Sequence, residues 1–243
     1  MNKMNEFSIA VIVPCYNEYD RLPLDDFLAF GKNHPEFFFL FVDDGSTDGT
    51  GSLIKPHCNR QIQLLTLPTN SGKAEAVRQG ILNALEKGFP KIAFWDADLA
   101  TPLDEIFGFI KKMDQDGSWD MVIGSRIHRL GAHIKRNVWR HLIGRALMTV
   151  ILYFIVDFSV YDSQCGAKVM TAEAAREIMN KPFITRWLFD LEMLVRLKHF
   201  RKTNLEDCVY EYPLSRWQEI GASKVRVFTV LKDVIRFNRY YRR

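Results

Sequence analysis

The feature that most constrains the fold of this chain is a series of short apolar runs, each of which stops abruptly at a polar loop. Ser8–Val13, Phe37–Val42 and Ile92–Trp95 are too short for ordinary helices, and they are rich in the branched and aromatic side chains that favour strands. Strands that are apolar along their whole length belong to sheets covered on both faces. The runs therefore predict an α/β fold, and 243 residues suit one such domain.

Helical patterns separate these runs. We expect helices over 20–34, 48–58, 72–87 and 102–116, and two further strands over Gln61–Leu67 and Asp120–Gly124. Alternation of strand and helix predicts a parallel, doubly wound sheet with helices on both faces. The second half differs, because its expected elements are helices over Val138–Val156, 171–180, 187–200 and Val225–Tyr240.

Two acids follow the fourth apolar run at once, in Asp96-Ala97-Asp98. Pro102 suits the first turn of the next helix, so both carboxylates stand at the carboxyl end of a strand. Ligands of open α/β sheets bind at that edge, where Mg²⁺ or Mn²⁺ is held by carboxylates together with substrate phosphates. We therefore expect Asp96 and Asp98 to hold a divalent cation. A phosphatase nucleophile motif is disfavoured, because Ala100 stands where that motif has Thr or Val.

Polar loops also follow the first two strands, over Pro14–Glu18 and Asp43–Thr50. Tyr16 offers a ring face on which a nucleobase can stack. A carboxylate at Asp43 or Asp44 can accept a hydrogen bond from a ring N–H of uracil or guanine. The alternative is that the second loop only forms a turn and caps the next helix.

A third polar loop, Asn70–Lys73, precedes the helix over 72–87. Backbone N–H groups at a helix start can bind a phosphate, and Lys73 or Arg78 could lie near a diphosphate there. The spacing is not that of a Walker A loop, and by itself the segment indicates only a helix start. Small residues near Ala76 and Gly80 predict that this helix packs closely on its neighbour.

The formal net charge of +4 is unevenly distributed. From Met121 to Val156 there is no Asp or Glu, while Lys and Arg occur at Arg126, Arg129, Lys135, Arg136, Arg140 and Arg145. A second basic group lies in 224–243, where Asp233 is the one acid. Both groups could meet phosphates or an anionic membrane surface. No nucleic-acid recognition motif accompanies them, so we expect no nucleic-acid partner.

Four widely spaced cysteines without CxxC spacing, and a polar start without signal-peptide character, predict reduced thiols in a cytoplasmic protein. The longest apolar run, Ala146–Val156, is well short of the ~20 residues that span a bilayer. If the protein meets a membrane, we expect it to lie on the inner face as a peripheral protein.

Taken with later motifs, these loops make the chain similar to a known family over nearly its whole length. It resembles the family 2 glycosyltransferases, which have the Rossmann-like GT-A fold. Four motifs carry the resemblance in the first half, namely VPCYNE, VDDGSTDGT, NSGKAEAVRQG and DADLATP. The later motifs are most similar to those of dolichyl-phosphate β-glucosyltransferases, with dolichol-phosphate mannose synthases close, and they are GSR at 124–126, DSQCGAK at 162–168, RWLFDLE at 186–192 and WQEI at 217–220.

The resemblance implies a GT-A fold with a mostly parallel sheet and a helical C-terminal part. It also implies a nucleotide-sugar donor of UDP-glucose or GDP-mannose type, a polyprenyl or dolichyl phosphate acceptor, inversion at the anomeric carbon and Mg²⁺ or Mn²⁺ as cofactor. Two departures concern the acceptor side, since Ala167 replaces the usual aromatic residue and Gly221-Ala222 replaces an acidic–Gly pair.

Residues of this chain that match the family's motifs, together with those chosen above, give a candidate site. For the nucleotide sugar they are Pro14, Tyr16, Asn17, Glu18, Asp43, Asp44, Lys73, Arg78, Asp96 and Ala97, with Asp96 and Asp98 on the metal. The candidate catalytic residues are Arg126, Arg140 and Lys168 on the acceptor phosphate and Asp162 near the reacting centre.

The attacking group distinguishes two functions. A lipid monophosphate is mostly dianionic at neutral pH and needs cations, whereas a sugar hydroxyl needs a general base, for which Asp162 and Glu192 are candidates. The acid-free basic stretch favours the phosphate, since two phosphorylated reactants repel each other unless cations intervene. A family 2 enzyme acting on a sugar hydroxyl in glycan synthesis is the alternative. A nucleotidyltransferase and an inactive binding module are less favoured.

We expect residues 1–223 to form the glycosyltransferase domain and residues 224–243 to form a basic amphipathic helix. That helix would dock on anionic lipid, with a solvated helix end as the alternative. The helix over Val138–Val156 would shelter the first prenyl units or lie on the membrane, and the alternative is an ordinary buried core helix.

Overall fold

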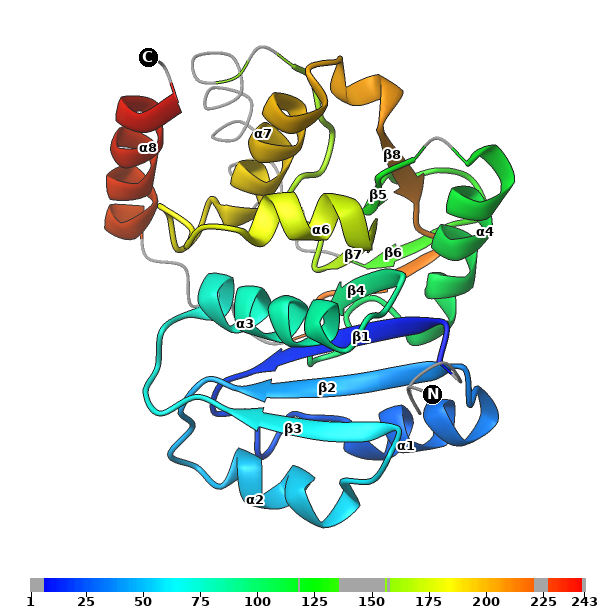
Figure 1. Cartoon of the computed structure of the whole chain (residues 1–243). Coiled ribbons are helices and arrows are strands. Elements are labelled where there is room, and N and C mark those ends of the chain that lie inside the picture. Colours follow the sequence, from blue (N-terminus) through cyan, green and yellow to red (C-terminus); the bar gives the residue numbers. More distant parts are fainter. Residues whose placement is uncertain (1–6, 118, 136–155, 157, 221–226, 242–243) are drawn as a thin grey trace.

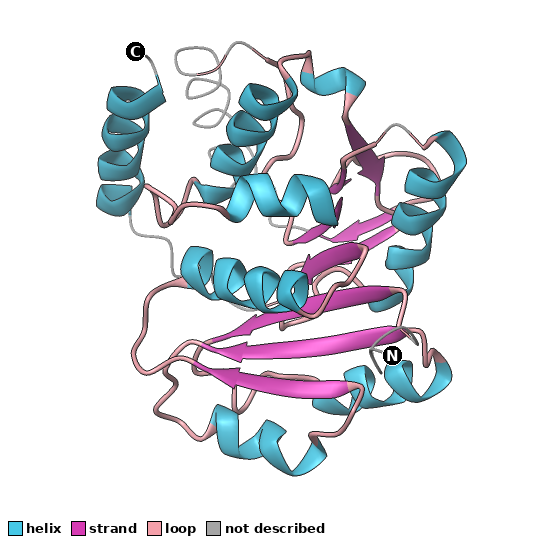
Figure 2. Ribbon diagram, in the orientation of Figure 1, coloured by secondary structure: helices cyan, strands magenta, loops and turns pink. Residues whose placement is uncertain are grey.

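A seven-stranded sheet with helices on both faces forms the body of the protein (Figures 1 and 2). The structure is a computed structural model that describes residues 7–117, 119–135, 156, 158–220 and 227–241. The strand order is β3-β2-β1-β4-β7-β5-β8. The strands are β1 (Ile9–Cys15), β2 (Phe37–Asp43), β3 (Ile62–Thr66), β4 (Lys91–Trp95), β5 (Met121–Ser125), β7 (Ala167–Thr171) and β8 (Val209–Pro213). A separate pair consists of β6 (His133–Lys135) and β9 (Arg216–Gln218).

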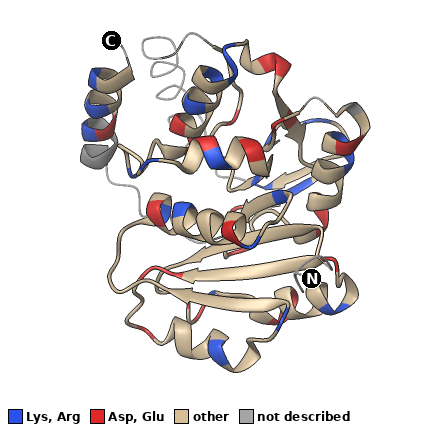
Figure 3. Cartoon of the chain, viewed as in Figure 1, with Lys and Arg blue, Asp and Glu red and all other residues tan. Residues whose placement is uncertain are grey.

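Helices cover the sheet in two layers, and most charged residues lie on them and on the loops (Figure 3). One layer contains α1 (Leu24–Asn33), α2 (Thr50–Ile54) and α4 (Ile106–Asp116). The other contains α3 (Lys73–Glu86), α6 (Ala172–Met179) and α7 (Phe189–Arg201). The last helix, α8 (Val227–Tyr241), packs on α7, and short 3₁₀ turns are η1 (Lys55–His57), η2 (Leu103–Glu105) and η3 (Leu205–Asp207).

The central strands are buried on both faces, as their continuous apolar character predicts. In β1, Ala10 and Ile12 belong to the core beneath α3, while Val11 and Val13 belong to the core beneath α1 and α4. The predicted close packing of α3 is present, because a Cβ on Gly80 would lie 2.3 Å from the Ile12 side chain. Each apolar strand thus joins two helical layers.

The sheet is mostly parallel, as the family resemblance implies, but it contains one antiparallel strand that the alternation of strands and helices did not predict. Between β4 and β5 lies β7, which runs antiparallel to both, with Trp95 opposite Ala167 and Ile123 opposite Lys168. Sequence patterns predicted β1 to β5 but missed β6, β7, β8 and β9. The segment that forms β7 has a lysine at its second position, and this interrupts the apolar pattern on which strand prediction depends.

In the described part of the chain, no helix is both long and apolar enough to cross a bilayer. The helix predicted over Val138–Val156 lies outside the described residues, apart from Val156, and so does Arg140. The carboxyl ends of β1 to β5 meet at one edge of the sheet, where the start of β7 joins them. This edge brings the predicted motifs together.

Candidate functional site

The loops after β1 and β2 form one hydrogen-bonded unit. The Ser46 N–H donates to Asp43 Oδ1 (2.9 Å), and the Asn17 N–H donates to the Ser46 hydroxyl (3.0 Å). In return, the Thr47 N–H donates to Asn17 Oδ1 (2.9 Å), and Asn17 has a φ of 51°. The ring of Tyr16 is 40% exposed beside this unit. A base could stack there while Asp43 stays fixed below it.

Glu18 and Asp48 stabilise the same two loops. The Glu18 N–H donates to Thr50 Oγ1 (2.9 Å), and the Glu18 carboxylate accepts from Arg21 (2.6 Å). Asp48 Oδ1 accepts from the Thr50 N–H (2.9 Å) at the start of α2. The turn-and-cap interpretation of this segment is therefore correct for Asp48. The strand β1 contributes Pro14, which lies opposite Val42.

Asp44 joins the second loop to the third. Its two carboxylate oxygens accept from the N–H groups of Ser71 and Gly72, each at 2.7 Å, and its side chain is almost fully buried. Burial raises the pKa of Asp44 although these hydrogen bonds oppose the shift. Because both carboxylate oxygens of Asp44 already accept backbone hydrogen bonds, Asp44 holds the two loops together. Asp43 is therefore the better candidate for contact with a nucleobase.

The two acids after β4 differ in their partners. Asp96 Oδ1 lies 2.5 Å from Lys73 Nζ, and the Asp96 N–H donates to the Gly166 carbonyl (2.8 Å). Asp98 Oδ1 accepts from the Ala100 N–H (3.0 Å). Burial, and then the negative charge of Asp96, raise the pKa of Asp98. Ala97 between them is buried in the core.

The chemistry of this pair suits a divalent ion that is shared with a ligand. Across the described ranges, no three His, Cys, Asp or Glu side chains come together as a complete metal site. Two carboxylates with substrate phosphates are a common Mg²⁺ or Mn²⁺ ligand set. The loop that contains Gly166 lies very close to Asp96, because a Cβ on Gly166 would lie 1.8 Å from Asp96 Oδ2. Glycine at this position lets Asp96 lie against the start of β7.

Arg126 and Asp162 form a bidentate ion pair on the other side of this edge. Arg126 Nε and Nη2 each donate to the carboxylate at 2.6 Å, and the Arg126 N–H adds a third bond at 3.0 Å. The Trp217 ring lies 5.1 Å from the guanidinium. Burial alone would raise the pKa of Asp162, but the charge of Arg126 and the hydrogen bonds that Arg126 donates together outweigh it and lower the pKa. Asp162 therefore stays charged and orients Arg126.

Lys168 forms a second, deeper ion pair. Its side chain is fully buried, and its ammonium donates to Asp190 Oδ1 (2.5 Å) and to the Cys165 carbonyl (2.6 Å). Burial raises the pKa of Asp190, against the charges of Lys168 and Lys73. An acceptor phosphate cannot reach this ammonium, so the predicted contact between Lys168 and the acceptor is wrong. Lys168 instead forms a buried ion pair inside the domain. Asp190 lies in the RWLFDLE motif, but nothing in that motif predicts its ion pair with Lys168.

Comparisons with known proteins agree with this geometry. The sequence model described as Glycosyl transferase family 2 matches residues 10–178. The chain belongs to this family. As a member, it is a glycosyltransferase, and the family assignment made from its motifs is confirmed.

The transferase is similar to several curated dolichyl-phosphate β-glucosyltransferases. One from Trichomonas vaginalis is 33% identical and covers 98% of this chain and 73% of that protein. Those of Drosophila melanogaster and Homo sapiens are 34% and 31% identical, and each covers 90% of this chain and 70% of the relative.

Solved structures confirm the GT-A fold. Glucosyl-3-phosphoglycerate synthase from Mycobacterium tuberculosis with phosphoglyceric acid has a TM-score of 0.67 at 15% identity, covering 96% of this chain and 81% of that one. The same enzyme with Mn²⁺, UDP-glucose and phosphoglyceric acid has a TM-score of 0.66, also at 15% identity, covering 95% and 80%. At this identity the likeness shows the fold alone.

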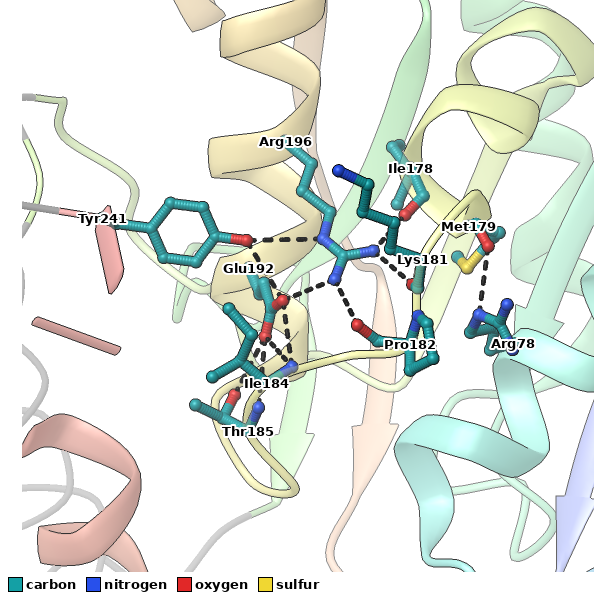
Figure 4. Close-up of polar contacts among 10 residues, drawn as sticks. All are labelled: Arg78, Ile178, Met179, Lys181, Pro182, Ile184, Thr185, Glu192, Arg196 and Tyr241. Atoms are coloured by element: carbon teal, nitrogen blue, oxygen red, sulfur yellow. Dashed lines mark hydrogen bonds and ion pairs between the residues drawn. The ribbon is translucent and has the colours of Figure 1, made fainter. Parts of the chain in front are cut away.

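Two further charged residues of the transferase lie away from the strand ends (Figure 4). Arg78 Nε donates to the Met179 carbonyl (3.0 Å), and its Nη1 donates to Glu75 (2.9 Å). It ties α3 to α6, so the structure does not bring it to the donor loops as predicted, because it lies more than one turn into the helix. Glu192 is fully buried and bound to Arg196 (2.7 Å), so it is not free to act as a general base.

A cavity of about 370 Å³ lies at the opposite edge of the transferase sheet. It is lined by Trp119 and Asp120 before β5, by Glu173 of α6, by Arg201 at the end of α7 and by residues that follow α7. Arg201 closes this region by pairing with Asp120 and with Glu173. None of the predicted site residues lines it, so we assign the function to the loops at the carboxyl ends of the strands.

Proposed function

We propose that this transferase moves a glucosyl residue, with inversion, from a UDP-glucose-type donor to a polyprenyl phosphate such as dolichyl phosphate. The observation that carries the proposal is the state of the two candidate bases. Asp162 is held bidentately by Arg126, and Glu192 is buried against Arg196. Neither can take a proton from a sugar hydroxyl, whereas an ionised phosphate needs no base.

The names of the relatives support the donor and the acceptor. Each is called a dolichyl-phosphate β-glucosyltransferase, and the solved neighbour of similar fold binds UDP-glucose with Mn²⁺. On the donor side, Tyr16 and Asp43 would contact the base. Lys73, at the start of α3, would face the diphosphate together with the backbone N–H groups there.

Asp96 and Asp98 would hold a Mg²⁺ or Mn²⁺ ion. Two neighbouring carboxylates fit such an ion, and in the structure Asp96 pairs with Lys73, whose charge offsets part of the repulsion between the two acids. When bound, the ion supplies charge stabilisation to the leaving nucleoside diphosphate. Desolvation alone would lower the pKa of Lys73, but the charges of Asp96 and Asp190 outweigh it and raise the pKa. Lys73 therefore stays protonated and adds positive charge at the same place.

Arg126 would receive the acceptor phosphate. It is held rigid by Asp162 and by Trp217, and it is close enough to Asp96 for that charge to act on its pKa. A rigid guanidinium suits an oxyanion because little side-chain entropy is lost on binding. The phosphate oxygen would attack the anomeric carbon from the face opposite the leaving diphosphate, and a single displacement inverts that centre.

The test uses the full chain with radiolabelled UDP-glucose or GDP-mannose, Mg²⁺ or Mn²⁺ and a short polyprenyl phosphate. We expect label from UDP-glucose to move to the lipid fraction as an acid-labile product. Transfer to oligosaccharide hydroxyls but never to the lipid phosphate would favour the alternative function. No transfer with any donor would refute the proposal.

The pH profile gives a second test of base-free attack. We expect the rate to rise as the acceptor phosphate loses its second proton, with a pKa of ≈ 6, and then to stay level. An analogue acceptor with a different second pKa should shift the rise by the same amount. If the rate rises at the same pH with both acceptors, the titrating group belongs to the protein, which contradicts the mechanism.

We also propose that the outward face of α8 meets the membrane. Asp233 and Phe237 of this helix are buried, whereas Lys232, Ile235, Arg236, Arg239 and Tyr240 are exposed. Basic and apolar side chains on one helix face suit an anionic lipid surface. This surface would bring the acceptor lipid and the transferase together.

A further inference from the structure

Two carboxylates hold the loop that leads into α7. Glu192 of α7 accepts from the N–H groups of Ile184 (3.0 Å) and Thr185 (3.3 Å) (Figure 4). Asp233 of α8 accepts from the next two N–H groups, those of Arg186 (3.1 Å) and Trp187 (2.7 Å). Four successive backbone donors are therefore fixed by side chains from two different helices.

The position of Asp233 depends on how α8 packs. Phe237 is fully buried against Leu188, Leu191 and Val195. One turn further on, the Tyr241 hydroxyl donates to Glu192 Oε1 (3.1 Å), which joins the two carboxylate clamps (Figure 4). The last helix is thus built into the support of this loop.

The side chain that the loop carries extends to the donor side. Arg186 Nη2 lies 3.4 Å from Asn70 Oδ1, and a Cβ on Gly72 would lie 2.9 Å from Arg186 Nε. Gly72 has a φ of 94° and directly precedes α3. The guanidinium therefore lies over the loop whose N–H groups Asp44 binds.

The guanidinium of Arg186 is not bonded directly to a carboxylate in the described part of the chain, although the charges of Arg186 and Asp44 attract each other. Arg126, Arg196 and Arg201 each pair with a carboxylate, whereas within the described residues Arg186 has a contact with an amide oxygen and no ion pair. Its backbone is fixed while its exposed guanidinium keeps its charge for a ligand. A fixed Arg fork beside a helix start is suited to a phosphorylated ligand.

We infer that Arg186 binds the nucleoside diphosphate of the donor and that Asp233 is a positioning residue that holds Arg186 in place from the C-terminal helix. The inference rests on the proposed function and extends it, because it makes α8 part of the donor site. Loss of the Asp233 carboxylate leaves two N–H groups without their acceptor, so the loop shifts and Arg186 leaves Gly72.

The test measures binding of UDP and of GDP, each with Mn²⁺, to the full chain by calorimetry. We expect Arg186→Ala to weaken binding of the preferred nucleotide about tenfold and Asp233→Ala to weaken it about threefold to fivefold. Because Asp233 acts through Arg186, the double variant should bind no more weakly than Arg186→Ala alone. Asp233→Asn should restore part of the affinity, and Arg176→Ala, at an exposed arginine of α6, should bind as wild type does.

Each result decides the inference. If wild type binds a nucleotide and Arg186→Ala binds it equally well, the inference falls while the proposed function stands. If the effects of the two substitutions multiply, Asp233 does not position Arg186. Wild type that binds neither nucleotide overturns the proposed function and this inference with it. Should Asp233→Ala fail to fold by circular dichroism, Asp233→Asn replaces it in the same cycle.

Discussion

The two halves of the site hold their charged groups in different ways. In the half built by β1 to β4, carboxylates such as Asp43, Asp44 and Asp98 accept hydrogen bonds from backbone N–H groups. In the half built around β5 and β7, carboxylates hold cations in buried pairs, as in Arg126–Asp162 and Lys168–Asp190. The first half shapes loops around a ligand, and the second half orients positive charge.

This difference has an energetic consequence. Asp98 of the first half is half-buried, so its carboxylate can be removed at the cost of local order, because water can reach the group it leaves. A buried pair is different, since removing one partner leaves an uncompensated charge and costs about 3–5 kcal/mol. Substitution of Asp98 should therefore affect catalysis more than folding, whereas substitutions in the buried pairs of the second half should affect folding strongly.

The largest effect should come from Asp98→Ala. We expect a loss of turnover of about a thousandfold, because an ion at this pair would supply several kcal/mol to the transition state. Thermal unfolding should barely change, since within the described residues the Asp98 side chain accepts a hydrogen bond from the Ala100 N–H alone. Asp25→Ala, an exposed acid of α1, is the control for a lost surface charge. A fully active Asp98→Ala enzyme would remove the metal assignment.

Two lysines give a direct test of the contrast between the halves. Lys73 and Lys168 each lie 2.5 Å from an aspartate, but the Lys73–Asp96 pair is 41% and 33% exposed and the Lys168–Asp190 pair is 0% and 7% exposed. We expect Lys168→Met to lower the free energy of unfolding by about 3–5 kcal/mol and Lys73→Met by about 0–1 kcal/mol. Urea unfolding measures both.

A second variant separates charge from packing at Lys168. Replacing both partners, in Lys168→Met with Asp190→Asn, should recover much of the stability, because no buried charge is then left unpaired. Equal losses for Lys73→Met and Lys168→Met would break the proposed contrast.

The Arg126–Asp162 pair should make stability depend on pH. The pKa of Asp162 is lower in the folded protein than in the unfolded chain, so its carboxylate stabilises the fold above the unfolded value of ≈ 3.9. That contribution is lost as the pH falls through the folded pKa. We expect Asp162→Asn to be less stable than wild type by about 2–3 kcal/mol at pH 7, and the gap to narrow as the pH falls from the unfolded value through the lower folded pKa. A gap independent of pH would mean that the charge of Asp162 does not matter.

The smallest effect concerns α8 and lipid. We expect Arg236→Glu with Arg239→Glu to reduce sedimentation with anionic liposomes, since each Lys or Arg contributes about 1 kcal/mol near such a surface. Point variants are preferable to removal of the helix, because removal also takes away Asp233 and Phe237. Lipid binding equal to that of wild type would contradict docking through this face, while nucleotide binding serves as the control.

Sequence reasoning reached the first half more completely than the second, for the same physical reason. The hydrogen bonds from the Ser46 N–H to Asp43 and from the Thr50 N–H to Asp48 link near neighbours in the chain, so a loop motif already contains them. The bonds that join the loops of this half, such as that from the Asn17 N–H to the Ser46 hydroxyl, span 29 residues and no motif contains them. Arg126 and Asp162 are 36 residues apart and Arg186 and Asp233 are 47 apart. Hydrophobic periodicity and motif spacing do not predict pairs of residues so far apart in the chain.

The errors follow the same rule. Lys168 was predicted to face an acceptor because a lysine inside a short motif suggests a ligand, but β7 places it in the centre of the sheet. The sequence makes Glu192 a candidate base, but in the structure its carboxylate accepts hydrogen bonds from four residues, which are Ile184, Thr185, Arg196 and Tyr241. Exposure and partners decide the role of a charged residue, and both depend on the fold.

The late position of β7 in the sequence affects how the sheet is completed during synthesis. β4 ends at Trp95, yet the strand that covers its free edge begins only at Ala167. Until the ribosome has delivered that segment, β4 and β5 each have an open edge lined by apolar side chains, which is a template for pairing with other chains. A nascent chain that stops before Ala167 should therefore aggregate, whereas one that extends past Thr171 can close the centre of its sheet.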